Sequence, residues 1–393
     1  MENLFAAIQM NKPFTYLEFF AGGGMARAGL GSEWKCLFAN DFDHKKSDVY
    51  RINWGSNELR TADIRTLNAS SIPDVADLAW GSFPCQDLSL AGGGAGLKGE
   101  RSGTFYPFWD LMRGLAKDGR SPRMIVLENV CGALTSHQGT DFAAICSTFA
   151  QCGYQYGAVV VDAELFVPHS RPRLFFIGVL DGTEIPTSVA IDAPSNSWHP
   201  HALRFAHAAL PKSVKTMWTW WNFPKPSPRT ITLADLIEDT PSGVRWHTQE
   251  ETSALLGMMS AVNLAKVEKV KKLGTRVVGG IYKRTRLNEN GVKVQRAEVR
   301  FDDVSGCLRT PTGGSSRQLI MVIHGTKIRS RLISTRETAR LMGLPDTYRL
   351  PSNYNEGYHL TGDGVVVPVV RHLAYHVFER ILAKGFRDAK IAA

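Results

Sequence analysis

The stretch TYLEFFAGGGMARAGL, residues 15–30, has the pattern of a β-strand, a glycine turn and the start of a helix. Thr15–Phe20 is apolar and β-prone, three glycines follow Ala21, and Met25–Leu30 is compatible with a helix. Glycines at the end of a strand allow a tight turn and let a ligand approach the backbone closely. The turn lacks the Gly-x-Gly-x-x-Gly spacing, which argues against a dinucleotide ligand.

The alternation of strand and helix continues to about residue 180. Helix-like stretches occupy 105–115 and 141–152, and further strand candidates are Trp34–Asn40, Val75–Trp80, Met124–Leu127, Tyr156–Val161 and Arg173–Leu180. Strands that alternate with helices predict βαβ units and a mostly parallel sheet, and hence an α/β fold.

Length and composition set outer limits on the class of protein. The chain has 393 residues, which allows two domains or one large domain with an insertion. Its 44% apolar and 21% charged residues exclude a mostly disordered chain, a collagen and a disulfide-rich miniprotein. The sequence has no run of 18 apolar residues and no basic flank with a long apolar run at its start, so we expect neither a membrane span nor a secretory signal. Its six cysteines form no Cys-x-x-Cys pair, which favours a reducing compartment and predicts no metal site.

The second half of the chain has a different texture and a concentrated positive charge. Residues 182–264 are rich in Pro, Ser, His and Trp and show poor periodicity, whereas 335–342 and 365–382 are again helix-like. Lys266–Arg336 holds 17 Lys or Arg against 5 Asp or Glu, a net charge of +12, while the rest of the chain carries −3. Such a segment indicates a polyanionic partner, although a solvated basic face remains the alternative.

The most specific local feature is Gly81-Ser82-Phe83-Pro84-Cys85-Gln86, at the C-terminal end of the third expected strand. Ligands bind at that edge of a parallel sheet, and Pro84 constrains the turn that presents Cys85. This context favours a nucleophilic cysteine over a buried structural one. The next segment, 87–103, contains six glycines and suggests a loop that closes on a bound substrate.

Acidic and basic side chains mark other expected strand ends. Asp41, about 20 residues after the glycine turn, is placed to bind ribose hydroxyls, and Asp63 is another acid at an expected strand end, so the three features together favour a nucleoside-bearing cofactor. Glu128 ends another strand, where it is either a proton donor or acceptor near Cys85 or a helix cap or ion-pair partner. Arg171 and Arg173 precede the last strand and suit phosphate binding or polarisation of a carbonyl, with solvated arginines as the alternative.

Taken in order, these motifs resemble the cytosine-5 DNA methyltransferase family. The series is Phe-Ala-Gly-Gly-Gly, Pro-Cys-Gln, Glu-Asn-Val, Ser-Arg-Pro-Arg, a Leu-Arg-Thr-Pro-Thr-Gly-Gly run from Leu308 and the segment 335–345. It covers roughly residues 14–180 and 300–380. The resemblance implies a Rossmann-like S-adenosylmethionine-dependent methyltransferase sheet with a smaller inserted target-recognition domain. The implied division is 1–182 for catalysis and cofactor, 183–330 for target recognition and 331–393 for the return to the catalytic domain.

The resemblance also implies a reaction and its residues. Cys85 would attack carbon 6 of a cytosine, so that carbon 5 takes the methyl group of S-adenosylmethionine. Glu128 would hold ring nitrogen 3 and the exocyclic amine, and Arg173 would hold the carbonyl oxygen. Arg171 would lie near a phosphate or Cys85. The target base must leave the helical stack for this chemistry.

Two sets of binding residues follow from the same resemblance. The cofactor set is Phe20, Gly22, Gly23, Gly24, Asp41, Phe42, Asp63, Ile64, Pro84, Asp363 and Val365. The DNA set, drawn from the resemblance and from the basic segment, is Gln86, Ser89, Lys98, Arg101, Lys283, Arg284, Arg286 and Arg317. Three positions depart from the family: Asp41 stands where Glu is more common, His169 where Gln is usual, and Asp363 where Asn is usual.

Duplex DNA is therefore the expected partner of a monomer without membrane contact, prokaryotic or phage-encoded, cytoplasmic and nucleoid-associated. Methylation of transfer RNA and a non-catalytic, cofactor-holding DNA-binding protein are the alternatives. The large basic insert favours duplex DNA, and the intact Cys85, Glu128 and Arg173 favour an enzyme. The target site and the presence of a companion restriction endonuclease stay open.

Overall fold

The computed structural model describes residues 13–84, 102–309 and 317–383. They form two compact units. The first contains the chain up to Val160, Leu174–Pro224 and the residues from Val370 onward, and the second contains Val161–Arg173 and Lys225–Val369. These units differ from the expected boundaries, because 183–224 groups with the first unit and 331–369 with the second.

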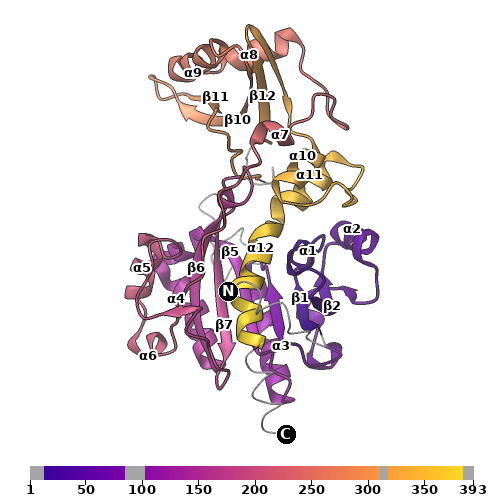
Figure 1. Cartoon of the computed structure of the whole chain (residues 1–393), viewed down its shortest axis with the longest axis vertical. Helices are drawn as coiled ribbons and strands as arrows, with labels where there is room; N and C mark the ends of the chain where they lie inside the picture. Colours follow the sequence, from indigo (N-terminus) through magenta and orange to yellow (C-terminus); the bar gives the residue numbers. More distant parts are fainter. Residues whose placement is uncertain (1–12, 85–101, 310–316, 384–393) are drawn as a thin grey trace, which may run out of the picture. The chain divides into compact units, whose positions relative to one another are not determined.

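The first unit is built on a seven-stranded sheet with the order β3-β2-β1-β4-β5-β7-β6 (Figure 1). The strands are β1 (Phe14–Phe19), β2 (Trp34–Asp41), β3 (Leu59–Thr61), β4 (Leu78–Gly81), β5 (Met124–Val130), β6 (Tyr154–Asp162) and β7 (Pro172–Leu180). The neighbours from β3 to β5 pair in parallel. The predicted α/β fold with a parallel central sheet is confirmed.

Helices cover this sheet, and its central strands are buried on nearly every residue. Leu17, Ala79 and Ile125 have no exposed surface, as expected for strands with apolar layers on both faces. The helices of this unit are α1 (Met25–Leu30), α2 (His44–Trp54), α3 (Phe105–Lys117), α4 (Thr140–Gln151), α5 (His201–Ala208) and α6 (Lys212–Lys215). The strand order reverses between β1 and β4, and such a switch point opens a ligand crevice at the carboxyl ends of the strands.

Residues 183–224 join the first unit through backbone and tryptophan contacts. The short strands β8 (Ala190–Ile191) and β9 (Trp220–Trp221) pair with each other. The indole N–H of Trp221 donates to the carbonyl of Ile177 in β7 at 3.1 Å, and the backbone N–H of Val160 in β6 donates to the carbonyl of Trp198 at 2.9 Å. These long-range contacts explain why the segment follows the sheet rather than the basic segment.

The second unit contains a four-stranded antiparallel sheet that the sequence pattern did not predict. Its order is β11-β10-β12-β13, with β10 (Arg276–Leu287), β11 (Lys293–Arg300), β12 (Leu319–His324) and β13 (Lys327–Leu332). Helices α8 (Gln249–Gly257) and α9 (Ala261–Lys271) cover it, and α7 (Leu233–Leu236) lies nearby (Figure 1). Leu255 and Val267 of these helices share a core with Ile281 and Met321 of the sheet.

Helices α10 (Thr335–Leu341) and α11 (Tyr354–Asp363) pack against each other in the second unit. Arg331 of β13 forms an ion pair with Glu337 of α10 at 2.5 Å, and both side chains are fully buried. Glu337 also accepts from the backbone N–H of Glu238 at 2.8 Å, and Arg331 donates to the carbonyl of Glu238 at 2.7 Å, which joins 331–369 to an earlier part of the second unit. Helix α12 (Val367–Leu373) follows and crosses the boundary between the units. No helix in the described part of the chain is long and apolar enough to cross a membrane.

Candidate active site

The glycine turn after β1 has a backbone that only glycine adopts without strain. Gly22 and Gly24 have φ values of 55° and 77°, and Phe20 also has a positive φ, 58°. A Cβ on Gly24 would lie 2.4 Å from Nε1 of Trp54. That indole instead donates to the carbonyl of Gly23 at 2.9 Å. The turn is therefore held against α2, and the expected glycine loop exists.

Asp41, at the end of β2, fastens this turn to the sheet. Its Oδ2 accepts from the backbone N–H of Gly22 at 2.7 Å, and its Oδ1 accepts from the N–H of Asp43 at 2.8 Å. The side chain is only 7% exposed, and burial raises the pKa of the carboxyl while Lys46 opposes the shift. Each oxygen keeps lone pairs for a further donor.

The neighbouring Asn40 holds the third loop of the same edge. Its amide donates to the carbonyls of Arg60 and Ala62, both at 2.9 Å, which fixes the chain just before Asp63. Asp63 in turn caps a short 3₁₀ turn by accepting from Arg65 N–H at 2.9 Å, and Ile64 is buried. The role of Asn40 was not predicted, and its place at a strand end beside Asp41 is the signal for it in the sequence.

The residues at this edge fit a nucleoside. Phe42 is 66% exposed, which is unusual for a large apolar ring and leaves a flat face for a purine. Asp41 and Asp63 follow the neighbouring strands β2 and β3 and offer carboxylate oxygens for hydroxyl and amine donors. The expected cofactor residues of the first unit therefore gather at the carboxyl ends of the strands. Asp363 and Val365 belong to the second unit.

A buried acid lies in β1, just before the turn. Glu18 is 1% exposed, and burial raises its pKa to about 8, while the charge of Arg27 opposes the shift. Arg27 donates to the hydroxyl of Tyr50 at 2.9 Å, and that hydroxyl contacts the sulfur of Cys36 at 3.7 Å. Burial of Glu18 therefore favours the protonated form of its carboxyl.

Hydrogen bonds fix the residues that follow β4 and directly precede Cys85 in the sequence. The amide of Asn129 donates to the carbonyl of Phe83 at 3.2 Å, and the indole of Trp80 donates to the hydroxyl of Ser82 at 2.9 Å. Glu128, also on β5, is 7% exposed. Pro84 is the last described residue before the gap, so Cys85, Gln86, Ser89, Lys98 and Arg101 lie outside the described residues. A separate role of Asn129 was not predicted, although this residue directly follows Glu128 in the sequence.

Arg171 connects three segments of the second unit. Its Nη2 donates to the carbonyls of Gly362 and Gly364, each at 2.8 Å, and its Nη1 donates to the carbonyl of Leu308 at 3.5 Å. The side chain is 2% exposed. Asp363 lies between the two glycines, at the exposed end of α11, while Val365 is buried. Contact of Arg171 with a phosphate or with Cys85 stays a prediction.

His169 is a neutral bridge. Its Nε2 accepts from the backbone N–H of Leu308 at 3.3 Å, so the ring proton is on Nδ1, which donates to the carbonyl of Leu341 at 3.2 Å. The ring has no exposed surface, and burial lowers its pKa well below the ordinary value, helped by the charge of Arg171. A glutamine amide also offers one donor and one acceptor, which explains how histidine can replace it.

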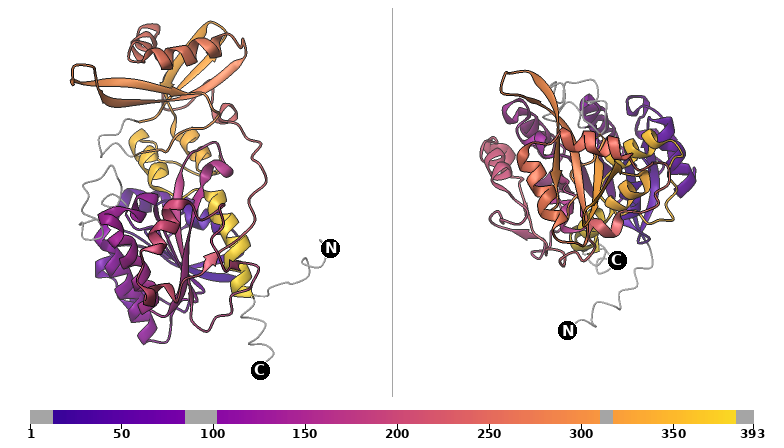
Figure 2. Two further views of the ribbon diagram at one scale, coloured as in Figure 1. Left: turned by 90° about the vertical axis from the view of Figure 1, so that its left-hand side faces the viewer. Right: turned by 90° about the horizontal axis from the view of Figure 1, so that it is seen from above.

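The basic segment forms part of the four-stranded sheet and extends beyond it. Strand β12 pairs with β10 only as far as Ile281, whereas the pairing with β11 continues to Leu287. We call the protruding pair, 282–287 with 293–298, the ribbon; it is the long hairpin in Figure 2. Lys283, Arg284 and Arg286 all lie on it, and both arginines pair with Glu298. Arg317 donates to the side chain of Asn355 instead.

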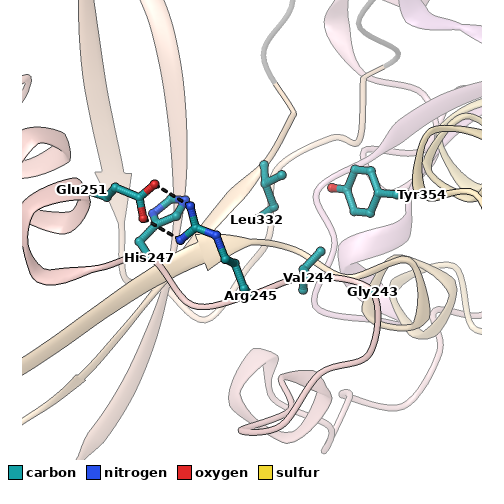
Figure 3. A pocket seen from close by; sticks show the side chains of 7 residues that line it. All are labelled: Gly243, Val244, Arg245, His247, Glu251, Leu332 and Tyr354. Carbon is teal, nitrogen blue, oxygen red and sulfur yellow. Dashed lines mark hydrogen bonds and ion pairs between the residues drawn. The ribbon is translucent and has the colours of Figure 1, made fainter.

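A shallow cavity of about 220 Å³ lies elsewhere in the second unit (Figure 3). Its polar side chains already satisfy one another. The Arg245 guanidinium donates to both oxygens of Glu251 at 2.7 Å, and the ring of His247 contacts the hydroxyl of Ser330. The cavity therefore adds nothing to the candidate active site. No group of three metal-binding side chains occurs in the described ranges.

A parallel sheet with a switch point, a glycine turn after β1 and carboxylates at the ends of neighbouring strands is typical of an α/β enzyme that binds a nucleoside cofactor. Residues 14–379 match the model of the C-5 cytosine-specific DNA methylase family, and the chain belongs to that family. It is a DNA cytosine-5-methyltransferase, and its methyl donor is S-adenosylmethionine.

Relatives are similar to this chain in sequence, and solved structures are similar to it in fold. Type II methyltransferase M.BsuFI of Bacillus subtilis is 26% identical over 375 residues, which are 94% of this chain and 73% of that protein. Type II methyltransferase M.HhaI of Haemophilus parahaemolyticus is 23% identical over 366 residues, 92% and 93% of the two chains. The Entamoeba histolytica methyltransferase EhMeth is similar in fold, with a TM-score of 0.59 at 13% identity over 95% of this chain and 99% of that one.

Proposed function

We propose that this enzyme methylates carbon 5 of cytosine within a specific duplex DNA sequence, through a covalent bond between Cys85 and a base turned out of the helix. The observation that carries the proposal is the hydrogen bond from Asn129 to the carbonyl of Phe83. It fastens the residues before Cys85 to β5, the strand that carries Glu128, and these residues follow β4, which borders the switch point of the sheet.

In the proposed reaction the Cys85 sulfur forms a bond to carbon 6 of the cytosine. Glu128 holds ring nitrogen 3 and the exocyclic amine, which lets the ring electrons move to carbon 5 without a full negative charge on the base. S-adenosylmethionine supplies an electrophilic methyl group when bound. A base then removes the proton from carbon 5, and the electron pair of that bond expels the Cys85 sulfur and restores the aromatic ring.

The ribbon supports a role in target recognition for the second unit. A two-stranded β-ribbon fits the major groove of DNA, where the edges of the bases are distinguishable. Because successive side chains of a strand point to opposite faces, Arg284 and Arg286 lie on one face of β10 and Lys283 on the other. We assign base contacts to the arginine face and phosphate contacts to the lysine face.

The relatives named as Type II methyltransferases also support a modification role beside a restriction endonuclease for the same site. We further propose a monomer that acts in the cytoplasm on nucleoid DNA. Size-exclusion chromatography with and without duplex DNA tests whether the enzyme is a monomer. Fractionation of producing cells tests its location. Digestion of the methylated DNA of these cells by candidate endonucleases tests the modification role.

Trapping of the covalent adduct tests the mechanism. Duplex DNA with 5-fluorocytosine at the target should form an irreversible adduct, because fluorine does not leave as a proton. Cys85→Ala should form no adduct and should keep its affinity for S-adenosylmethionine. The control Cys152→Ser changes a partly exposed cysteine directly after α4 and should react like the wild type. An adduct mapped to another residue contradicts the mechanism, and methylation of transfer RNA rather than duplex DNA contradicts the substrate.

A further inference from the structure

The second unit places Cys307 directly against the two arginines of the Ser-Arg-Pro-Arg motif. The Cys307 sulfur lies 3.5 Å from Nη1 of Arg171 and 3.9 Å from Nη2 of Arg173. Both arginine nitrogens donate toward it. Arg173 also donates to the carbonyl of Pro172 at 2.9 Å, but that acceptor belongs to the preceding residue and moves with the Arg173 backbone.

We propose that Cys307 is a positioning residue for Arg173, and that its sulfur holds the guanidinium where it meets the carbonyl oxygen of the target cytosine. This inference rests on the proposed function and on the role at the cytosine carbonyl oxygen that the family resemblance implies for Arg173. Cys307 directly precedes the motif that begins at Leu308 and is not part of it. Cys307 would fix the side chain of Arg173 without itself touching the substrate.

The backbone around Cys307 is held independently of the sulfur. Ser170 N–H donates to the carbonyl of Ser305, and Ser305 N–H donates to the carbonyl of Pro168, both at 2.8 Å. A Cβ on Gly306 would lie 2.0 Å from the hydroxyl oxygen of Tyr282, so the chain passes tightly under that ring. The sulfur therefore stands at a fixed point beside the arginines.

The charges around Cys307 suit an acceptor. The groups that face it are Arg171 and Arg173 from the motif, Arg309 beyond it in the chain, and the phenols of Tyr282 and Tyr358. Burial by itself raises the pKa of the Cys307 thiol, but the three arginines outweigh this effect and the pKa is lowered. Burial raises the pKa of both tyrosines, which stay neutral. A thiolate accepts stronger, charge-assisted bonds from arginine than a thiol does.

The first test is a set of single-turnover methylation rates on duplex DNA with saturating S-adenosylmethionine. Cys307→Ala should lower the rate about tenfold, the effect of losing roughly one charge-assisted hydrogen bond. Cys307→Ser should recover most of that loss, because a hydroxyl also accepts from arginine. The KM for S-adenosylmethionine should not change, and the control Cys152→Ser should match the wild type.

The second test asks whether Cys307 acts through Arg173. Once Arg173→Ala has removed the guanidinium, adding Cys307→Ala should cause no further loss of rate. If the double variant loses the product of the two single effects, Cys307 is only a packing residue and the inference is wrong. If Arg173→Ala alone keeps the wild-type rate, the proposed role of Arg173 is wrong, and the inference fails with it.

A third measurement does not require Cys307→Ala to fold. Alkylation of the wild-type enzyme by iodoacetamide, followed by peptide mapping, gives the pH dependence of reaction at Cys307. Its midpoint should lie below about 8.5, the value for a free cysteine, and should rise in Arg173→Ala. Duplex DNA should slow the reaction. A midpoint at or above that of a free cysteine, unchanged in Arg173→Ala, contradicts the inference.

Discussion

The backbone N–H of Gly22 donates to Oδ2 of Asp41 at 2.7 Å and so joins the glycine turn after β1 to the end of β2. A second bond links the same two loops, because Ala21 N–H donates to the carbonyl of Asn40 at 2.9 Å. The carboxylate that we assign to the ribose hydroxyls therefore also shapes the loop beside them. Loss of this carboxylate should weaken cofactor binding in two ways, because it removes the acceptor of the ribose hydroxyls and releases the glycine turn.

Asp41→Ala should weaken binding of S-adenosylmethionine by about 1.5–3 kcal/mol, the range for hydrogen bonds to a charged group. Titration calorimetry measures this change directly. Asp41→Asn should lose less, because one amide oxygen still accepts from Gly22. The matched control is Asp48→Asn, which changes an exposed acid of α2 that pairs with Arg51. An unchanged dissociation constant in Asp41→Ala removes this residue from the cofactor site.

Glu18 should make the enzyme less stable as the pH rises. Its pKa is about 8 in the folded state, above the ordinary value of 4.5, so it contributes stability that is complete below pH 4.5 and is lost as the pH rises through 8. In Glu18→Gln this dependence should vanish, and the variant should gain on the wild type by up to about 1.4 kcal/mol per pH unit in that interval. Urea unfolding between pH 5 and pH 8 measures the difference.

The control for this prediction is Glu33→Gln, which changes an exposed glutamate after α1 and should leave the pH dependence intact. Parallel stability curves for the wild type and Glu18→Gln would mean that Glu18 is already ionised in the folded protein.

Sequence reasoning succeeds where a local pattern determines the structure. Met25–Leu30 is a helix as predicted, and the first two strands agree within one residue at each end, because an apolar run, glycine turn and helix form one short unit. It failed on the four-stranded sheet. The core of that sheet joins Leu255 and Val267 to Met321, residues far apart in the sequence, and no short window contains that pairing.

In the candidate site, too, residues fixed by a local pattern could be predicted and residues fixed by distant contacts could not. Asp41 and Phe42 could be placed at a strand end from their sequence alone, and both lie there. The supporting roles of Asn40 and Asn129 could not be predicted, because each depends on a carbonyl from another strand or loop. Cys307 was equally hidden, since only the folded chain brings it to Arg171.

His169 supplies a test of a residue that departs from the family pattern. His169→Gln should change the free energy of unfolding by less than about 1 kcal/mol at pH 7.5, because its amide can keep both bonds. His169→Leu should cost about 1–3 kcal/mol for each buried backbone group left without a partner, those of Leu308 and Leu341. Urea unfolding measures both changes.

The pH dependence gives this test its control. The lowered pKa of His169 means that its stabilising effect is complete above about 6.5 and is lost as the pH falls toward the folded-state value. His169→Gln should therefore lose less stability than the wild type between pH 7.5 and pH 5.5. Equal losses would show that His169 is not the neutral bridge described here.

The ribbon offers a test in which its two faces behave differently. On one face Glu298 accepts from Arg286 at 2.8 Å and pairs with Arg284 at 3.3 Å, so a single carboxylate fixes both arginines. On the other face lie Lys283 and Lys293. Glu298→Gln should release the arginines and add positive charge, so we expect tighter binding to any duplex and weaker discrimination among sequences.

Lys283→Ala should weaken binding to all duplexes alike and reduce the slope of log affinity against log salt by about 1, the effect of losing one phosphate contact. Arg286→Ala should cost about 1–3 kcal/mol on the cognate site and relax the choice of base at one position, because an arginine reads guanine through two hydrogen bonds. Binding to cognate and single-base-variant duplexes over a range of salt separates the two effects. Lys271→Ala, whose ammonium pairs with Glu268 on α9 at 2.8 Å, is the control and should bind like the wild type. If Lys283→Ala and Arg286→Ala both match that control in affinity, salt slope and sequence preference, the ribbon is a solvated basic surface and target recognition lies elsewhere in the chain.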